Sequence, residues 1–135
     1  MKDIERRSTF TLSLAAMALV PGAVAAQQRA PTEGLEIRPG IRQVDLGERQ
    51  SRIQGYNKVR MRDIVFQPGA DLPDSEMANA MVCHITEGEL TVRQDGRDFV
   101  ARKDTVWDCG VGTREGAKNN GNTAAVMRVT DLLTS

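Results

Sequence analysis

The chain has 135 residues, no formal net charge, and an aromatic content of only 4%. This length predicts a single domain, and the lack of a basic or aromatic-rich surface argues against nucleic-acid binding. Its two cysteines lack a C-x-x-C spacing, which excludes a zinc ribbon, and its single histidine excludes a site built from several imidazoles.

Residues 1–26 are expected to be an export signal that is removed from the mature chain. Arg6 and Arg7 precede an apolar core at 12–20 that is too short for a stable membrane anchor. The adjacent arginines resemble a twin-arginine signal, and an ordinary Sec signal stays open as the alternative. Either route predicts a bacterial protein that is periplasmic or secreted, begins near Gln27, and has no membrane span in its mature chain.

The mature chain is expected to divide into two parts. Residues 27–57 form an N-terminal arm and edge strand, and the main β-domain occupies 58–135. Within the arm, 41–46 has the pattern of a short strand, whereas 47–55 is polar and turn-like. The segment 58–67 begins with alternating apolar and charged residues, which is typical of a half-buried strand.

Pro68-Gly69 predicts a turn that leads into a variable loop, and short strands continue through the rest of the chain. An apolar run at 80–85 stops at a Glu-Gly-Glu turn around Gly88, which predicts a β-hairpin. Asp95-Gly96 predicts a second hairpin turn. Further strands are expected at 97–102, 105–107 and 124–133, with a glycine-rich loop at 110–116 and a turn at 118–122 before the last. No window after Pro21 shows helical periodicity, so the pattern predicts an all-β sandwich or barrel.

At this level the chain resembles the cupin superfamily of small β-barrels. Gly69 and Gly88 stand at the separation of the two glycines in the first cupin motif, and Gly112 and Asn119 hold the frame of the second. The resemblance covers roughly residues 59–132. It implies a double-stranded β-helix, or jelly-roll barrel, over 58–135. It also implies a homodimer, because cupins commonly pair through sheet edges.

Cupins commonly bind a divalent metal through histidines and a glutamate of these motifs. The resemblance places the four ligand positions at Ser75, Met77, Met81 and Glu115. A three-histidine site cannot form in a chain with one histidine, and methionine fills space with flexible apolar atoms. The sequence therefore predicts no conventional metal centre and no cofactor.

Two other ligand sets stay open as alternatives. The first is a divalent metal held by Glu115 and Glu76, which offer the carboxylates that such ions accept. The second is monovalent copper held by Met77, Met81 and Cys83, because copper in this state prefers soft sulfur ligands.

Six residues are predicted to line a ligand pocket in the barrel: Ser75, Met77, Met81, Cys83, Trp107 and Glu115. Glu115 is also the candidate catalytic residue, because a carboxyl group in an apolar barrel has a raised proton affinity and can act as a general acid or base. An exposed loop glutamate paired with Arg114 or Lys118 is the alternative.

Other polar residues have simpler interpretations. Arg60 and Arg62 are expected on the solvated face of their strand, with a clamp for a substrate carboxylate as the alternative. His84 is expected to point outward if the inward register of its strand is correct. Cys83 and Cys109 leave three alternatives: a disulfide, inert buried thiols, or a functional thiol.

The sequence favours a secreted cupin-like protein that binds a small molecule or serves as an accessory subunit, without a conventional metal centre. One alternative is a cupin-type lyase, isomerase or oxygenase that acts on a small organic acid or sugar-derived substrate. Another is a structural or partner-binding barrel.

Overall fold

The computed structural model describes residues 29–134, and the export signal expected at 1–26 lies outside them. The compact unit that begins at Pro31 is built from β-strands, with no helix among its described residues. It therefore contains no helix that could cross a membrane. The strands are β1 (Leu35–Arg38), β2 (Ile41–Gln50), β3 (Lys58–Phe66), β4 (Asp71–Glu76), β5 (Ala80–Glu87), β6 (Glu89–Gln94), β7 (Arg97–Arg102), β8 (Val106–Cys109), β9 (Arg114–Lys118) and β10 (Ala125–Leu133).

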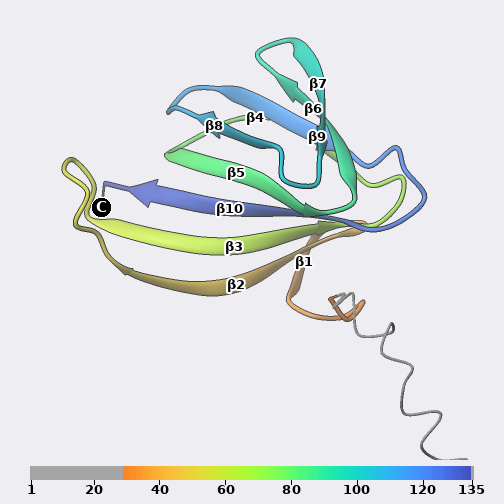
Figure 1. Ribbon diagram of the computed structural model, residues 1–135, viewed down its shortest axis with the longest axis horizontal. Helices are drawn as coiled ribbons and strands as arrows, with labels where there is room; N and C mark the ends of the chain where they lie inside the picture. Colours follow the sequence, from red (N-terminus) through yellow and green to blue (C-terminus); the bar gives the residue numbers. More distant parts are fainter. Residues whose placement is uncertain (1–28, 135) are drawn as a thin grey trace, which may run out of the picture. The chain divides into compact units, whose positions relative to one another are not determined.

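The strands form two antiparallel sheets that lie one above the other (Figure 1). The larger sheet has the order β1-β2-β3-β10-β5-β8, and the smaller has the order β4-β9-β6-β7. From β4 to β10 the chain passes repeatedly from one sheet to the other, so neighbours within each sheet come from distant parts of the sequence. This is a jelly roll, and the predicted all-β jelly-roll fold is confirmed.

The prediction of a hairpin around Gly88 is wrong. β5 pairs with β10 and β8, whereas β6 pairs with β7 and β9, so the chain changes sheets at this turn. Gly88 has a φ of 70°, and a Cβ atom there would lie 2.5 Å from the carbonyl oxygen of Ala124. The corner therefore requires glycine for its backbone conformation and for its close approach to the start of β10.

The hairpin predicted at Asp95-Gly96 is confirmed. β6 and β7 pair with Gln94 opposite Arg97, which leaves a two-residue turn. Asp95 and Gly96 both have positive φ angles, of 49° and 83°. This is the conformation that a tight two-residue turn needs to match the twist of its strands.

Three segments predicted as loops are strands or parts of strands. β2 continues through 47–50 because it stays paired with β3 beyond a bulge between Asp45 and Gly47, although both of its faces are exposed there. β4 and β9 pair with each other inside segments predicted to be loops and turns. Their sequences lack a regular apolar alternation, and a buried carboxyl group, Glu115, occupies an inward position of β9.

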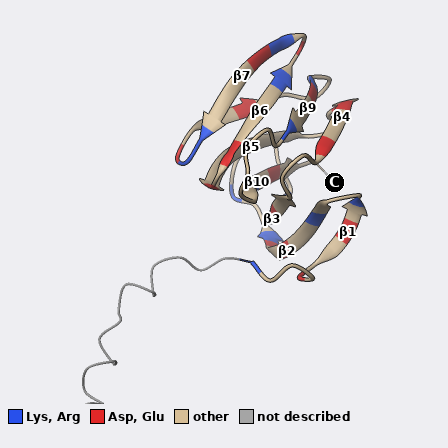
Figure 2. Ribbon diagram, turned by 90° about the vertical axis from the view of Figure 1, so that its right-hand side faces the viewer, with Lys and Arg blue, Asp and Glu red and all other residues tan. Residues whose placement is uncertain are grey.

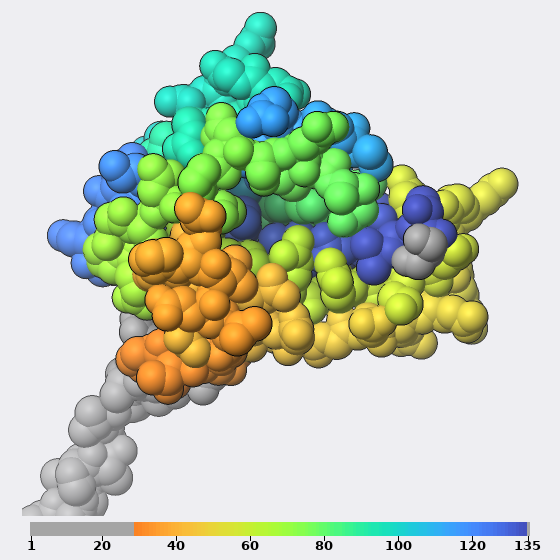
Figure 3. Space-filling view, turned by 180° about the vertical axis from the view of Figure 1, so that it is seen from behind, coloured from red at the N-terminus to blue at the C-terminus, as the bar shows by residue number. Residues whose placement is uncertain are grey.

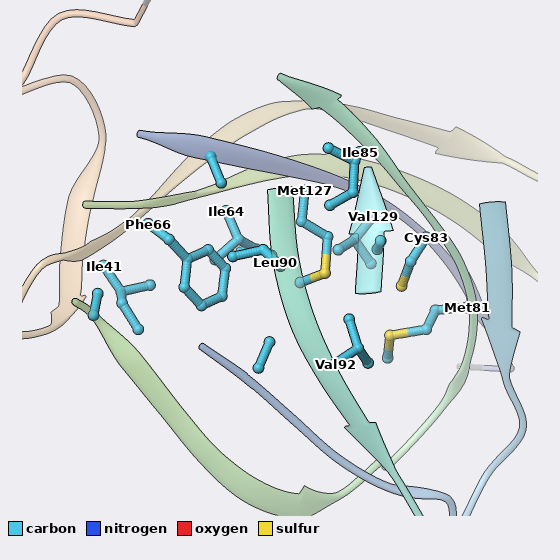
Figure 4. Packing of buried hydrophobic residues seen from close by; sticks show 14 of the residues in the cluster. Ile41, Ile64, Phe66, Met81, Cys83, Ile85, Leu90, Val92, Met127 and Val129 are labelled. Atoms are coloured by element: carbon cyan, nitrogen blue, oxygen red, sulfur yellow. The ribbon is translucent and has the colours of Figure 1, made fainter. Parts of the chain in front are cut away.

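The apolar core lies between the two sheets. Figure 4 shows Ile64, Phe66 and Met127 of the larger sheet packed with Leu90 of the smaller. Alternate residues of β5, including Cys83, are buried there. Complete burial of a side chain such as that of Phe66 stabilises the fold by about 1.5–3 kcal/mol.

Charged residues of both signs are distributed over both sheets (Figure 2). Many of them form ion pairs across neighbouring strands, such as Arg128 of β10 with the buried carboxylate of Asp63 on β3. The part of the chain that the structure describes therefore presents no broad face of a single charge.

Candidate ligand pocket

A cavity of about 250 Å³ lies between the sheets. Side chains from β1, β3, β4, β5, β9 and β10 line it, and most of them are apolar. Figure 3 shows a hollow bordered by β1 (orange) and by the green segments β4 and β5, with β10 (blue) visible at its floor. Strands of both sheets therefore enclose the cavity, and β1 and β4 lie beside its opening.

The structure brings the six residues of the predicted pocket into one region. Five of them line the cavity directly: Ser75, Met77, Met81, Cys83 and Glu115. The sixth, Trp107, lies on β8 and donates a hydrogen bond from its indole Nε1 to Glu115 Oε1 over 3.1 Å. The six side chains therefore lie close together, and their role in binding a ligand stays a prediction.

Glu115 is the buried polar group of this cavity, with 6% of the residue exposed. Its Oε1 atom accepts hydrogen bonds from Trp107, from the Cys109 thiol over 3.0 Å, and from the Gln94 amide over 3.2 Å. No described residue donates a hydrogen bond to its second oxygen, Oε2. The alternative of an exposed loop glutamate is wrong, because β9 pairing turns this side chain inward.

Burial raises the pKa of Glu115 above its ordinary value, and hydrogen bonds from Cys109, Trp107 and Gln94 only partly offset this effect. The carboxyl group therefore holds its proton more firmly than an exposed glutamate does. A buried carboxyl with one unpartnered oxygen is able to exchange a hydrogen bond with a molecule in the cavity.

Cys83 and Cys109 are free thiols, and both are buried. Cys83 lies opposite Trp107, and Cys109 lies opposite Met81, so the two thiols are diagonal neighbours on β5 and β8. Hydrogen bonding with Cys109, burial, and the charge of Glu115 all raise the pKa of Cys83. Of the three alternatives left open by the sequence, the structure has no disulfide: Cys83 and Cys109 are buried free thiols.

Arg62 also lines the cavity, so its expected place on a solvated face is wrong. It donates hydrogen bonds to the fully buried Asp131, from Nε over 2.8 Å and from Nη2 over 3.1 Å. Arg60 and Asn79 bind the same carboxylate. Burial alone would raise the pKa of Asp131, but hydrogen bonds from Arg62, Asn79 and Arg60 lower it below its ordinary value.

Sequence reasoning did not connect Arg62 with Asp131, nor Cys109 and Gln94 with Glu115. The alternation of β3 showed that Arg60 and Arg62 share a face, but it could not identify the inner face. The partners of Asp131 lie 52–71 residues away in the sequence. Those of Glu115 include Trp107 and Cys109, only eight and six residues before it, but on the separate strand β8, so the pattern within β9 did not point to them.

His84 and Glu76 lie outside the lining of this cavity. His84 is half-buried on the face of β5 opposite to Cys83, as its predicted outward position requires. Glu76 is exposed at the end of β4, whereas Glu115 is buried. The structure therefore gives no support to a divalent metal held by Glu115 and Glu76.

No protein-family model and no curated protein matches the sequence. Solved structures do match the fold. An RmlC-like cupin from Shewanella frigidimarina aligns over 79% of this chain and 91% of its own, with 20% identity and a TM-score of 0.61. The cupin domain of Cnp3 from Schizosaccharomyces pombe aligns over 80% of this chain and 74% of its own, with 19% identity and a TM-score of 0.61.

The protein has the cupin fold. An oxalate oxidase matches as well, over 84% of this chain and 64% of its own, with 20% identity and a TM-score of 0.60. Identities this low show the fold alone, because one cupin architecture carries unrelated activities.

The four positions at which cupins commonly hold a metal do not fit such an ion here. Ser75, Met77 and Met81 supply a hydroxyl and two thioethers, and Glu115 is the one carboxyl group. Divalent ions in proteins are held by several oxygen, imidazole or thiolate ligands, and only Glu115 among these four residues supplies one of the stronger donors, so the four positions together do not form such a site. The sulfur atoms proposed for copper do belong to residues of one cavity, since Met77, Met81 and Cys83 all line it.

Proposed function

We propose that the protein binds a small, mainly apolar organic molecule between its two sheets, with Glu115 as the polar anchor. One observation carries this proposal: an apolar cavity of about 250 Å³ ends at a buried carboxyl group whose Oε2 atom accepts no hydrogen bond from residues 29–134. Ligand pockets are typically concave and apolar with a few convergent polar groups, and usually measure roughly 300–1,000 Å³. A cavity just below this range suits a small ligand.

The wall of the cavity favours an apolar ligand body. Ile64, Leu72 and Val129 present branched aliphatic surface, and Met77 and Met127 present flexible thioethers. Each Å² of apolar ligand surface removed from water contributes about 25 cal/mol. Methionine side chains adapt their shape, so the cavity is suited to ligands that differ slightly in outline.

The polar groups favour a ligand with one hydroxyl group. A buried polar atom without a partner costs about 1–3 kcal/mol, and a ligand hydroxyl placed at Glu115 Oε2 would remove this cost. Arg62 donates hydrogen bonds to Asp131 and to Gln43 Oε1. It therefore contributes positive charge to the cavity wall, but its guanidinium group is not free to bind a ligand carboxylate. A strongly anionic ligand is therefore disfavoured beside Glu115.

The proposed site of action is outside the cytoplasm, where the protein would act as a binding or accessory protein. Residues 1–26 support this proposal through their charged start, short apolar core and small residues before Gln27. Pairing through sheet edges would make it a homodimer, as the resemblance to cupins implies.

Trp107 provides a direct test of binding, because it is the single tryptophan of the chain and its indole contacts Glu115. Phenol, cyclohexanol and 1-hexanol combine an apolar body with one hydroxyl. We expect at least one of them to change tryptophan emission saturably and to raise the melting temperature. Mass spectrometry of the recovered ligand separates binding from the alternative of catalysis, since a bound ligand returns unchanged.

Ala117→Leu should fill part of the cavity and weaken this binding at least tenfold, because Ala117 lines the wall. Val111→Leu is the matched control, since Val111 is 72% exposed and lies away from the cavity. Circular dichroism of both variants checks that they remain folded. The proposal fails if none of the three compounds binds, or if filling the cavity leaves their affinity unchanged.

A further inference from the structure

At the wall of the cavity lies a cluster of three buried side chains from three different strands: Cys83 of β5 and Glu115 of β9, which line the cavity, and Cys109 of β8. Their two sulfur atoms and a carboxylate oxygen all lie within 4.8 Å of one another. We infer that Cys83, Cys109 and Glu115 form a binding site for one zinc-like divalent cation. This inference does not depend on the organic ligand proposed above.

The site differs from the one implied by the resemblance to cupins. Of the four positions at which cupins commonly hold a metal, it uses only Glu115. Cys83 lies two residues beyond Met81 on β5, and Cys109 faces Met81 across the β5–β8 pair. The cation would therefore sit farther along β5 than a conventional cupin metal, between the two cysteines and the smaller sheet.

The geometry needs only a small adjustment to accept the ion. Zinc binds sulfur at about 2.3 Å and carboxylate oxygen at about 2.0–2.2 Å, so tetrahedral ligand atoms lie about 3.6–3.8 Å apart. Cys109 Sγ and Glu115 Oε1 are 3.0 Å apart and would move outward, whereas a pair near the 4.8 Å limit of the cluster would move inward. Both thiol protons would be released to solvent on binding.

The chemistry of the three donors selects the class of ion. Two thiolates disfavour magnesium and calcium, which prefer oxygen ligands, and the carboxylate disfavours monovalent copper, which prefers sulfur. Cys83 lines the cavity, so the fourth position of the ion would face it and accept water or a ligand atom.

Neighbouring groups already hold the proposed ligands in place. Trp107 Nε1 and Gln94 Nε2 donate hydrogen bonds to Glu115 Oε1, and Gln94 Nε2 also lies 3.5 Å from Cys109 Sγ. Such outer contacts orient the ligands of protein metal sites and raise metal affinity. Arg62 on the same wall offsets part of the negative charge that two thiolates and a carboxylate would bring.

The test is a titration of chelator-treated protein with Zn²⁺ in competition with a chromophoric chelator, with Mg²⁺ as the comparison ion. We expect one Zn²⁺ per chain and no competition by Mg²⁺. Cys83→Ser and Cys109→Ser should each weaken binding at least 100-fold, and Glu115→Gln at least tenfold. His84→Gln is the control. It removes the single imidazole of the chain, which does not line the cavity, and should leave the affinity for Zn²⁺ unchanged.

Because buried cysteine variants risk misfolding, the unaltered protein is also titrated with Co²⁺. Thiolate ligation then appears as charge-transfer absorption in the near ultraviolet. The inference is overturned if this absorption is absent, if binding survives both serine substitutions, if His84→Gln abolishes it, or if thiol counting in the unfolded protein finds a disulfide. Tryptophan titrations with phenol in chelator-treated protein test the organic-ligand proposal separately, so either proposal can fail alone.

Discussion

Asn119 shows how one buried amide joins two turns of the barrel. Its Nδ2 donates hydrogen bonds to the carbonyl oxygens of Phe66 and Thr123, and its Oδ1 accepts one from the Gly121 amide. The residue is fully buried, so water cannot replace these partners. The asparagine of the second cupin motif therefore has a structural explanation in this chain.

Asn119→Ala should lower the free energy of unfolding by about 2–3 kcal/mol, because the buried Phe66 carbonyl loses its partner and the part-buried bonds to Gly121 and Thr123 are lost as well. Urea denaturation at neutral pH measures the change. Asn120→Ala is the control, since Asn120 is exposed and bonds only Thr91 among the described residues; its effect should stay within about 0.5 kcal/mol. Equal effects of the two substitutions would contradict this role for Asn119.

Asp131 stabilises the protein through its charge. Asp131→Asn should cost about 2–3 kcal/mol at pH 7, because Arg60 and Arg62 lose a buried anionic partner while remaining partly exposed to solvent. The folded-state pKa of Asp131 lies below its ordinary value of 3.8, so this stabilisation is present above that value and disappears as pH falls through the folded pKa.

The difference in unfolding free energy between the wild type and Asp131→Asn should therefore shrink as pH is lowered below about 3.8. Urea denaturation at a series of pH values measures it. Asp98→Asn, at an exposed position of β7, is the control and should show no such change. A difference that stays constant down to pH 2 would contradict the assignment.

Among the elements, the corner between β5 and β6 determines how the two sheets connect. Gly88 approaches the backbone of Ala124 and Ala125 so closely that no side chain fits, and the corner carries the chain from the larger sheet to the smaller. The same corner separates the strand that carries Cys83 from the sheet that carries Glu115. The position of Cys83 relative to Glu115 thus depends on the sharp corner that Gly88 permits.

Gly88→Ala should destabilise the fold by about 2–4 kcal/mol, because the added methyl group meets backbone atoms at 2.5 and 2.8 Å and the φ angle is positive. Thermal and urea unfolding measure the loss. Gly110→Ala is the control, since an added Cβ there meets nothing within 4 Å. If both variants unfold like the wild type, the close contact between Gly88 and the backbone of Ala124 and Ala125 is contradicted.

For the whole molecule, the export signal is the feature with a direct cellular test. Expression of the full chain in a bacterium should yield a shortened form that begins near Gln27 in the periplasmic fraction. Intact-mass spectrometry identifies the cleavage site. Lysine substitution of Arg6 and Arg7 should stop export if the signal is of the twin-arginine type. Accumulation of the intact chain in the cytoplasm would contradict the expected export.

Much of the fold could be predicted from local patterns. The register implied by the cupin resemblance put Met81 on the inward face of 80–85, and the two-residue period of a strand put Cys83 there as well. Asp95-Gly96 identified a tight turn, because a turn depends on residues close together in the chain. The spacing of glycines around the first motif led to the cupin resemblance. The scarcity of histidine excluded the conventional metal centre from composition alone.

Only the tertiary structure could show that β5 and β6 belong to different sheets, that β4 and β9 are strands, and that Arg62 binds Asp131. It alone placed Cys109 beside Cys83 and Glu115. These relations arise from pairings between distant segments, such as β10 with both β3 and β5. A local sequence pattern shows which residues of a strand share a face. The residues that contact this face come from other strands, so they depend on how the whole chain pairs into its two sheets.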